Sequence, residues 1–134
     1  MSGTFLIDSN TAIFFFKGHQ QVVETWRKTP PSEVRITSIS LYELLVGVTT
    51  STRPNDRREQ LNTLLKYVQV IDYDQRAAEF SSVIQADLQK KGNVIGPLDT
   101  LIAGIALAHN LTLVTNNLRE FQRVDGLKCT DWTK

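Results

Sequence analysis

Three carboxylates in this sequence each lie in an apolar stretch. Asp8 ends the run FLID, Glu43 lies within LYELL, and Asp99 lies within PLDTLI. Carboxylates that share a site repel one another and raise one another's pKa values, so a fold keeps such a set when a cation neutralises it. An all-oxygen ligand set without histidine or cysteine favours Mg²⁺ or Mn²⁺ over zinc. If the fold brings these three residues together, they predict a Mg²⁺ site.

A Mg²⁺ ion held by carboxylates binds its substrate through phosphate oxygens. This predicts metal-assisted attack of water on a phosphodiester, because the ion lowers the pKa of its water and offsets the charge that builds on the phosphate. Two ions about 4 Å apart would hold both the attacking and the leaving oxygen. The chemistry that the three acids predict is therefore phosphodiester hydrolysis.

Each of these acids also has a purely structural explanation. Asp8 can cap a helix that follows it. Glu43 stands three residues after Ser40, which is the spacing of a capping box. Asp99 lies in the first turn of a predicted helix, where a negative charge gains roughly 0.3–1 kcal/mol from the helix dipole. The functional interpretation therefore depends on whether separate segments converge.

Other acids serve as controls for this interpretation. Asp72 and Asp74 also follow a predicted strand, yet neither is embedded in apolar residues, and Asp74 begins a regular helix. Taken singly, Glu120 and Asp125 are ordinary surface acids. We therefore interpret Asp72 and Asp74 as structural.

Strands and helices alternate from end to end. The predicted strands are residues 4–7, 34–39, 68–71 and 111–114. Ser9 or Asn10 is expected to cap the helix after the first strand, Ser40 the helix after the second, and Asp74 the helix after the third. Pro97 suits the first position of the helix before the last strand. The pattern predicts an α/β fold with a parallel sheet, helices on both faces, and a single domain over residues 1–134.

In open parallel sheets, ligands bind outside the carboxyl ends of the strands. That rule selects residues 8–10, 38–43 and 115–117, which follow the first, second and last predicted strands. Asp99 begins the helix before the last strand and can reach the same edge if its loop folds over the sheet. The topology therefore predicts that Asp8, Glu43 and Asp99 converge.

Composition restricts the possibilities less than the acids do. The formal charge of +1 provides no strong overall field for a polyanion, so nucleic-acid binding would depend on local clusters or metal ions. No apolar run approaches the roughly 20 residues that span a bilayer, and no secretory signal is recognisable. The single Cys129 cannot form an internal disulfide, which agrees with a reducing cytoplasm.

Four segments together resemble the PIN-domain ribonucleases, and more narrowly the VapC toxins of bacterial VapBC toxin–antitoxin pairs. The segments are LIDSN (6–10), SISLYELLVGV (38–48), GPLDTLIAGIAL (96–107) and LVTNNLREFQRVDGL (113–127). The resemblance runs from Phe5 to Trp132. It implies a three-layer α/β/α sandwich with an acidic pocket at the carboxyl edge of its sheet.

The resemblance also implies roles for individual residues. Asp8, Glu43 and Asp99 match the first three acids of the family, which act as metal ligands. Asn10 matches the polar residue that steadies the first acid by hydrogen bonding. The fourth acidic position falls on Asn117, a departure that removes one charge and weakens the expectation of a second metal ion.

Two further residues complete the site that the resemblance implies. Glu120, one helical turn after Asn117, can compensate for the missing acid, and Thr115 is expected to line the same pocket. Asp8, Glu43, Asp99, Asn117 and Glu120 form the expected catalytic set, with Mg²⁺ as cofactor and Mn²⁺ as a possible substitute.

Family resemblance further implies a substrate and partners. The members that this chain most resembles cleave tRNA near the anticodon and so stop translation. They are usually homodimers, and a VapB antitoxin covers the acidic pocket with its C-terminal segment. The toxin–antitoxin complex contacts operator DNA through the antitoxin. Part of the Phe14–Phe16 run is either antitoxin or dimer surface, or plain core.

Two alternatives remain open at this point. One is a catalytically silent PIN-like interaction module, which the intact set of acids argues against. The other is a phosphatase resembling the haloacid dehalogenases, with Asp8 as the covalent nucleophile. Asn10 argues against that second alternative, because it cannot supply the proton expected from an acid two residues after the nucleophile.

Overall fold

The computed structural model describes residues 4–134, and residues 1–3 of the predicted domain lie outside the described residues. The strands are β1 (Phe5–Ile7), β2 (Val34–Thr37), β3 (Gln69–Ile71), β4 (Thr112–Val114) and β5 (Cys129–Thr130). The helices are α1 (Ser9–Phe16), α2 (Gln20–Lys28), α3 (Ser38–Thr50), α4 (Pro54–Tyr67), α5 (Gln75–Lys90), α6 (Pro97–Ala108) and α7 (Leu118–Phe121), with a 3-10 turn, η1, at Pro31–Glu33. The predicted alternation of strands and helices is confirmed.

The strands form one parallel sheet in the order β3-β2-β1-β4-β5. Ile7 at the end of β1 pairs with Ile36 of β2 on one side and with Val114 of β4 on the other. The chain therefore places β2 and β3 on one side of β1, and then β4 and β5 on the other side. The crevice beyond the carboxyl ends of β1 and β4 is the topological switch point, where open α/β sheets bind ligands.

Neighbouring residues of the central strands point to opposite faces of the sheet, as the period of two requires. Leu6 and Leu113 belong to a core with α5 and α6, whereas the adjacent Ile7 and Val114 belong to a core with α1 to α4. The last two residues of both β1 and β4 are buried, which explains why these strands are predominantly apolar. The sheet thus separates two cores, and the predicted three-layer α/β/α architecture is confirmed.

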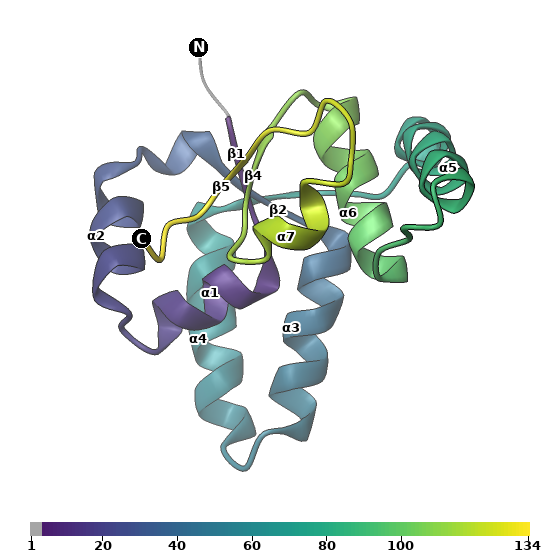
Figure 1. Ribbon diagram of the computed structural model, residues 1–134. Coiled ribbons are helices and arrows are strands. Elements are labelled where there is room, and N and C mark those ends of the chain that lie inside the picture. The colour runs from purple at the N-terminus through teal and green to yellow at the C-terminus, as the bar shows by residue number, and fades with distance from the viewer. Residues whose placement is uncertain (1–3) are drawn as a thin grey trace.

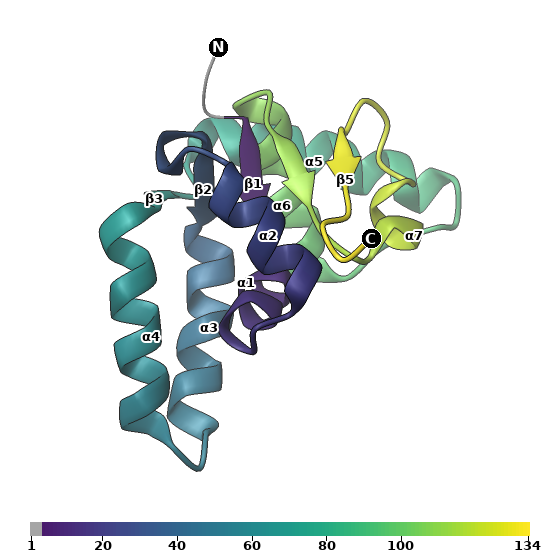
Figure 2. The ribbon, with the colours of Figure 1, turned by 90° about the vertical axis from the view of Figure 1, so that its left-hand side faces the viewer.

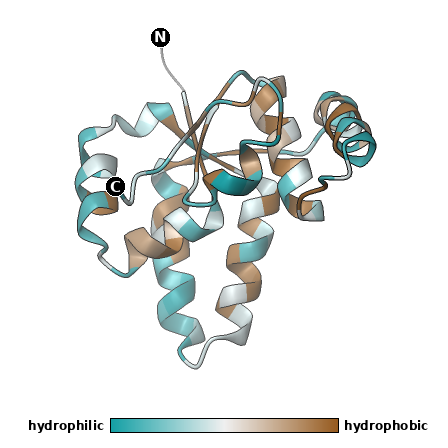
Figure 3. Ribbon diagram, viewed as in Figure 1, coloured by the Kyte–Doolittle hydropathy of each residue, from teal (hydrophilic) through white to brown (hydrophobic). Residues whose placement is uncertain are grey.

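Figures 1 and 2 show how the helices cover the sheet. Helices α3 and α4 form a long antiparallel pair that extends beyond the sheet edge, with α1 beside them, while α5 and α6 pack together on the other side. In Figure 3 the strands and α6 are predominantly hydrophobic, whereas α4 is predominantly hydrophilic. No helix within residues 4–134 is both long and apolar enough to cross a membrane.

Helices α5 and α6 approach each other closely at Gly104. A Cβ atom at this position would lie 1.9 Å from Ser81 Oγ and 2.8 Å from the backbone oxygen of Ala77. The backbone oxygen cannot move aside without moving α5. Glycine at position 104 therefore permits the contact that fixes α6, and with it the start of the helix that carries Asp99.

Two predicted helix caps are wrong. Asp8, rather than Ser9 or Asn10, caps α1, and Thr37, rather than Ser40, caps α3. The Thr37 hydroxyl accepts a hydrogen bond from Ser40 N at 2.9 Å, so α3 begins directly at the end of β2 without a loop. Glu43 consequently lies in the second turn of α3 and is not part of a capping box.

The C-terminal strand and the short helix before it were not predicted. Strand β5 has only two residues and joins the sheet beside β4, where Thr115 N donates to Thr130 O at 2.9 Å. Helix α7 spans four residues and carries Glu120. Because β5 is parallel to its neighbour, Asp131 emerges at the same edge of the sheet as Asp8.

Candidate active site

Asp8 lies at the switch point, where it interacts with Glu43 and Asp99; we call the cluster of Asp8, Glu43, Asp99 and Glu120 the acidic pocket. It follows β1 directly, and its backbone N–H donates to Val114 O at 3.1 Å, which ties it to the end of β4. One carboxylate oxygen accepts a hydrogen bond from Thr11 N at 2.7 Å as the cap of α1. The side chain is only 7% exposed, and this burial raises its pKa although hydrogen bonds with Thr115 and Thr11 act in the opposite direction.

Glu43 reaches the same pocket from α3. Its Oε1 accepts a hydrogen bond from the hydroxyl of Ser9, the first residue of α1, at 3.1 Å. Partial burial raises the pKa of Glu43, the Ser9 hydrogen bond lowers it, and the charge of Asp8 raises it further. Segments 34 residues apart in the sequence therefore place two interacting carboxylates side by side.

Asp99 and Glu120 form an acid pair on the other side of the pocket. Burial raises the pKa of Asp99 to about 7, with further increases from a hydrogen bond to Glu120 and from the charges of Glu120, Glu43 and Asp8. The pKa of Glu120 is lowered instead, chiefly because its carboxylate accepts the backbone N–H of Gly96 at 2.6 Å. Asp99 is therefore the member of the pair that holds a proton, and it loses this proton as the pH rises through about 7.

Gly96 and Asn117 hold this pair in place. A Cβ atom on Gly96 would lie 3.2 Å from Asp99 Oδ2 and 3.4 Å from Glu120 Oε1, so glycine allows the backbone to come close to both carboxylates. Asn117 Nδ2 donates to Glu120 Oε2 at 3.0 Å. Asn117 therefore positions Glu120 in the structure, and Glu120 brings a carboxylate to the part of the pocket where Asn117 lacks one.

Thr115 and Asn10 differ sharply in their surroundings. Thr115 is fully buried, lies beside Asp8 as predicted, and forms the side-chain hydrogen bond that lowers the pKa of Asp8. Asn10 is exposed, and the hydrogen bonds to Asp8 come from Thr11 and Thr115 instead. The predicted hydrogen bond between Asn10 and the first acid is therefore absent from this structure, and the two threonines supply it.

Asp131 is the acidic residue that sequence reasoning missed. It follows β5, and its charge is near enough to raise the pKa of Asp8. Its Oδ1 accepts hydrogen bonds from Thr133 N at 2.8 Å and from the Thr133 hydroxyl at 2.6 Å. The only available signal was its position after a parallel strand, and a strand of two residues shows no periodicity in the sequence.

Within the described residues the carboxylates of this pocket form no ion pair, although the charge of Arg123 helps to lower the pKa of Glu120. None of the ion pairs between residues 4–134 involves Asp8, Glu43, Asp99 or Glu120. Three of these four acids have raised pKa values, as expected when like charges share a half-buried site. Such a set of oxygen donors fits a hard divalent cation chemically.

The carboxylate groups of this pocket are not arranged around a single point. In the described part of the chain, no three acidic, histidine or cysteine side chains lie close enough together to form a complete metal site. The Asp8–Glu43 side and the Asp99–Glu120 side interact electrostatically across the pocket. To ligate one ion, side chains from both sides would have to turn inward.

Comparison with known proteins agrees with this site. The PIN domain family matches residues 5–127. The tRNA(fMet)-specific endonuclease VapC of Salmonella typhimurium is 38% identical over 128 residues, covering 96% of this chain and 97% of the relative. The enzyme of the same name from Shigella flexneri is 36% identical, with 96% and 98% covered.

Solved structures give the same result. The DNA-bound VapBC complex of Salmonella typhimurium matches with a TM-score of 0.91 and 38% identity, covering 98% of this chain and 99% of the other. VapBC2 of Rickettsia felis, bound to a DNA fragment from its promoter, matches with a TM-score of 0.89 and 29% identity, covering 96% and 98%. The chain belongs to the PIN-domain family, and within it to the VapC ribonuclease toxins.

Proposed function

We propose that this protein is a divalent-metal-dependent endoribonuclease that cleaves tRNA and acts as the toxin of a toxin–antitoxin pair. The observation that carries the proposal is the pocket at the switch point, where four carboxylates from separate segments interact and none of them forms an ion pair within residues 4–134. The near-full-length similarity to tRNA(fMet)-specific endonucleases supports tRNA as the substrate. It also makes the silent-module and phosphatase alternatives less suitable for this chain.

Asp8, Glu43 and Asp99 are the proposed ligands of Mg²⁺, with Mn²⁺ as a substitute. When bound, the ion would lower the pKa of water and stabilise the charge that develops on the phosphate. Asp8 is held by Thr11 and Thr115, so its position does not depend on the ion. Asp99 would lose its proton when the ion binds.

Glu120 and Asn117 are proposed to complete the site beside the three ligands Asp8, Glu43 and Asp99. Glu120 receives hydrogen bonds from Gly96 N and Asn117 Nδ2, which keep its carboxylate ionised and facing Asp99. The exposed Asn10 lies next to the pocket and is available to a bound substrate. Hydrolysis adds water across one P–O bond, and the pocket accommodates that bond between its two pairs of acids.

The aromatic groove is the proposed antitoxin site. It is a cavity of about 540 Å³ between the α1–α2 segment and α4, lined among others by Phe15, Phe16, Trp26 and the exposed Tyr67. Phe16 also lines a second, smaller pocket that reaches Glu43. An apolar antitoxin segment packed in this groove could therefore continue past Phe16 to the acids.

Two further proposals follow from the relatives. The solved VapBC complexes on DNA support an assembly in which the antitoxin contacts operator DNA and this chain contacts the antitoxin. A homodimer is proposed as the unit that enters this assembly. The cytoplasm, where tRNA is available, is the proposed location.

The test of activity is direct. Purified protein is incubated with bulk tRNA in Mg²⁺, with an EDTA control, and the new RNA ends are sequenced to locate the cut. Asp99→Asn is expected to abolish cleavage while keeping the fold, because it removes a metal ligand at constant volume. Asp72→Asn, at the exposed end of β3, is the matched control and should cleave like the wild type. Cleavage that continues in EDTA, or that survives Asp99→Asn, would refute the proposed role of the site.

The antitoxin site has its own test. Tyr67→Glu places a charge in the aromatic groove, whereas Val83→Glu places one on the exposed face of α5, on the opposite side of the sheet. Tyr67→Glu should retain tRNA cleavage but escape growth rescue by the co-expressed cognate antitoxin. Equal rescue of both variants would argue against the groove as the docking site.

A further inference from the structure

A second groove leads away from the acidic pocket. It has a volume of about 170 Å³ and lies between α1, α3 and α4, with Glu43 at one end and Arg57 among its lining residues. Along α3 it is lined by Glu43, Gly47 and Ser51, which are four residues apart and share one helix face. At 1.5 Å per residue this line is about 12 Å long. A strand that lies along the open mouth of this small groove would pass it with three to four nucleotides, at roughly 3.4 Å each.

Gly47 leaves this groove open, and the packing of the fold does not require a glycine at this position. It lies inside α3, where glycine costs roughly 0.5–1 kcal/mol relative to alanine. A Cβ atom built on Gly47 meets no atom within 4 Å, in contrast to Gly104, where packing requires the glycine. The glycine at position 47 therefore keeps the space in front of Glu43 open and is not needed for helix packing.

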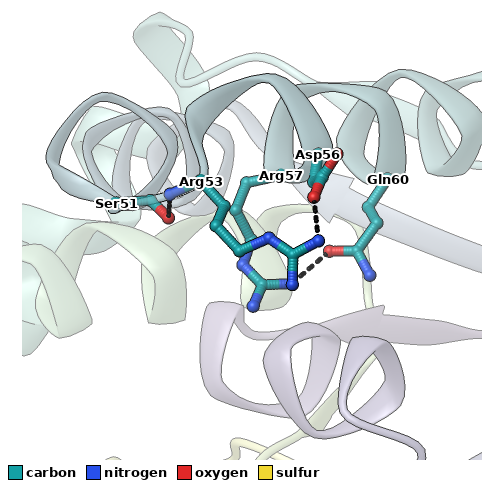
Figure 4. A network of polar contacts seen from close by, with 5 residues as sticks. All are labelled: Ser51, Arg53, Asp56, Arg57 and Gln60. Atoms are coloured by element: carbon teal, nitrogen blue, oxygen red, sulfur yellow. Dashed lines mark hydrogen bonds and ion pairs between the residues drawn. The ribbon is translucent and has the colours of Figure 1, made fainter.

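Two cations that line the groove form no ion pair with a carboxylate in the described part of the chain. Lys17 is the C-terminal cap of α1, and Arg57 lies in α4; both are exposed. Figure 4 shows that the Arg57 guanidinium donates to the neutral Gln60 at 2.9 Å, whereas the neighbouring Arg53 pairs with Asp56 at 2.6 Å. Arg53 is thus neutralised and Arg57 is not. The groove presents positive charge beyond Glu43, although the whole chain has a formal charge of only +1.

We propose that this groove holds the RNA strand that flanks the scissile phosphodiester, with Lys17 and Arg57 contacting backbone phosphates. The inference rests on the proposed ribonuclease function and adds the path of the substrate. Uncompensated cations beside an acidic pocket suit a polyanion, because lysine and arginine pair with its phosphates and release the counterions condensed there. The apolar walls formed by Ile13 and Leu44 suit contact with sugars and bases.

Charge removal tests the cationic part of the groove. Binding of fluorescent bulk tRNA is measured in EDTA, so that no cleavage occurs, across a range of salt concentrations. Arg57→Gln and Lys17→Gln should each weaken binding by roughly threefold to tenfold and reduce the salt-dependence slope by about 1. Arg58→Gln is the matched control: it removes the same charge from the next, exposed residue of α4, outside the groove. Equal effects of Arg57→Gln and Arg58→Gln would overturn the proposal.

Filling the groove tests its open space independently of charge. Gly47→Leu places a bulky side chain over the line from Glu43 to Ser51, whereas Gly47→Ala adds one methyl group. Both variants should melt at or above the wild-type temperature, and only Gly47→Leu should weaken tRNA binding, by about tenfold or more. Unchanged binding by a folded Gly47→Leu variant would rule out this path. Wild-type cleavage is measured alongside, so failure of the groove is distinguishable from failure of the ribonuclease activity.

Discussion

Asp8 and Asp74 have the same local role in very different surroundings. Each follows a strand of the parallel sheet and caps the next helix, and each accepts a hydrogen bond from the backbone N–H three residues later, at 2.7 Å from Thr11 and at 2.9 Å from Ala77. Asp8 is buried and surrounded by other acids, whereas Asp74 is exposed. Capping therefore explains the residue type at both positions, but it leaves the burial of Asp8 unexplained.

The difference comes from strand order. β1 is the central strand, between β2 and β4, so the residue after it faces the crevice at the switch point. β3 is an edge strand, and Asp74 begins a helix at the rim of the sheet. A capping aspartate at the centre is thus brought against Glu43 and Asp99, whereas one at the edge meets solvent. Position in the sheet, together with the apolar flanks that belong to a central strand, separates the proposed metal ligand from the structural cap.

The largest expected effect separates these two aspartates by activity. Asparagine caps helices about as well as aspartate, so Asp8→Asn and Asp74→Asn should both keep their helices. Asp8→Asn removes a proposed ligand and should lower tRNA cleavage by about 10²-fold or more, the scale seen when a group that stabilises transition-state charge is lost. Asp74→Asn should leave kcat unchanged. Equal activities of the two variants would show that Asp8 only caps α1 and has no part in cleavage.

Much of this contrast could be predicted from the sequence. Alternating apolar runs and helical spacing were enough for the parallel sheet and for the edge at which residues 8–10 and 115–117 meet. Apolar flanks distinguished Asp8 from Asp74, and the structure confirms this difference in burial. The long helices α5 and α6 begin where predicted, after the cap Asp74 and at Pro97. These features depend on periodicity, which a single sequence carries.

Other features depend on contacts that no local pattern shows. Thr37 caps α3 because β2 passes directly into the helix, and only the backbone conformation at that junction decides between Thr37 and Ser40. β5 was missed because two residues have no period, and Asp131 was missed with it. The role given to Asn10 belongs to Thr115, more than 100 residues away, because the sheet brings β4 beside β1.

A second experiment concerns the proton that Asp99 holds in the central pocket. In metal-free protein, Asp99 should titrate with a pKa of about 7, as followed by carboxyl-carbon NMR. Glu120→Gln removes the neighbouring charge and should lower this pKa, while burial and the charges of Glu43 and Asp8 keep it above the ordinary value. Asp72→Asn, at the end of the edge strand, should leave the titration unchanged.

The same titration sets how metal binding depends on pH. Asp99 must lose its proton to become a ligand, so Mg²⁺ affinity should rise as the pH increases through about 7. In Glu120→Gln the rise should shift to lower pH. The range from pH 5 to pH 8 extends from about two units below this pKa to about one unit above it. A wild-type Mg²⁺ affinity that stays constant over this range would show that Asp99 carries no proton that metal binding must displace.

The smallest expected effect is on stability. The pKa of Asp99 is raised from 3.8 to about 7 in the fold, so the folded state binds the proton more tightly than the unfolded state does. The stabilisation from this group is therefore present at low pH and is lost as the pH rises through about 7. At pH 8 in EDTA, Asp99→Asn removes the charge and should stabilise the protein by about 1 kcal/mol, after allowance for solvent screening of a half-buried group.

Asp74→Asn completes the comparison in the same melting experiment. It replaces an exposed cap by an equally good one, so its effect should stay within about 0.5 kcal/mol. The gain from Asp99→Asn should shrink as the pH falls toward 5, because the wild-type carboxyl is then protonated and the asparagine relieves no charge. A gain that is independent of pH would point to packing instead of charge relief. A loss of stability at pH 8 would show that the ionised Asp99 is already compensated in the metal-free fold, and that the central pocket is electrostatically no different from the edge.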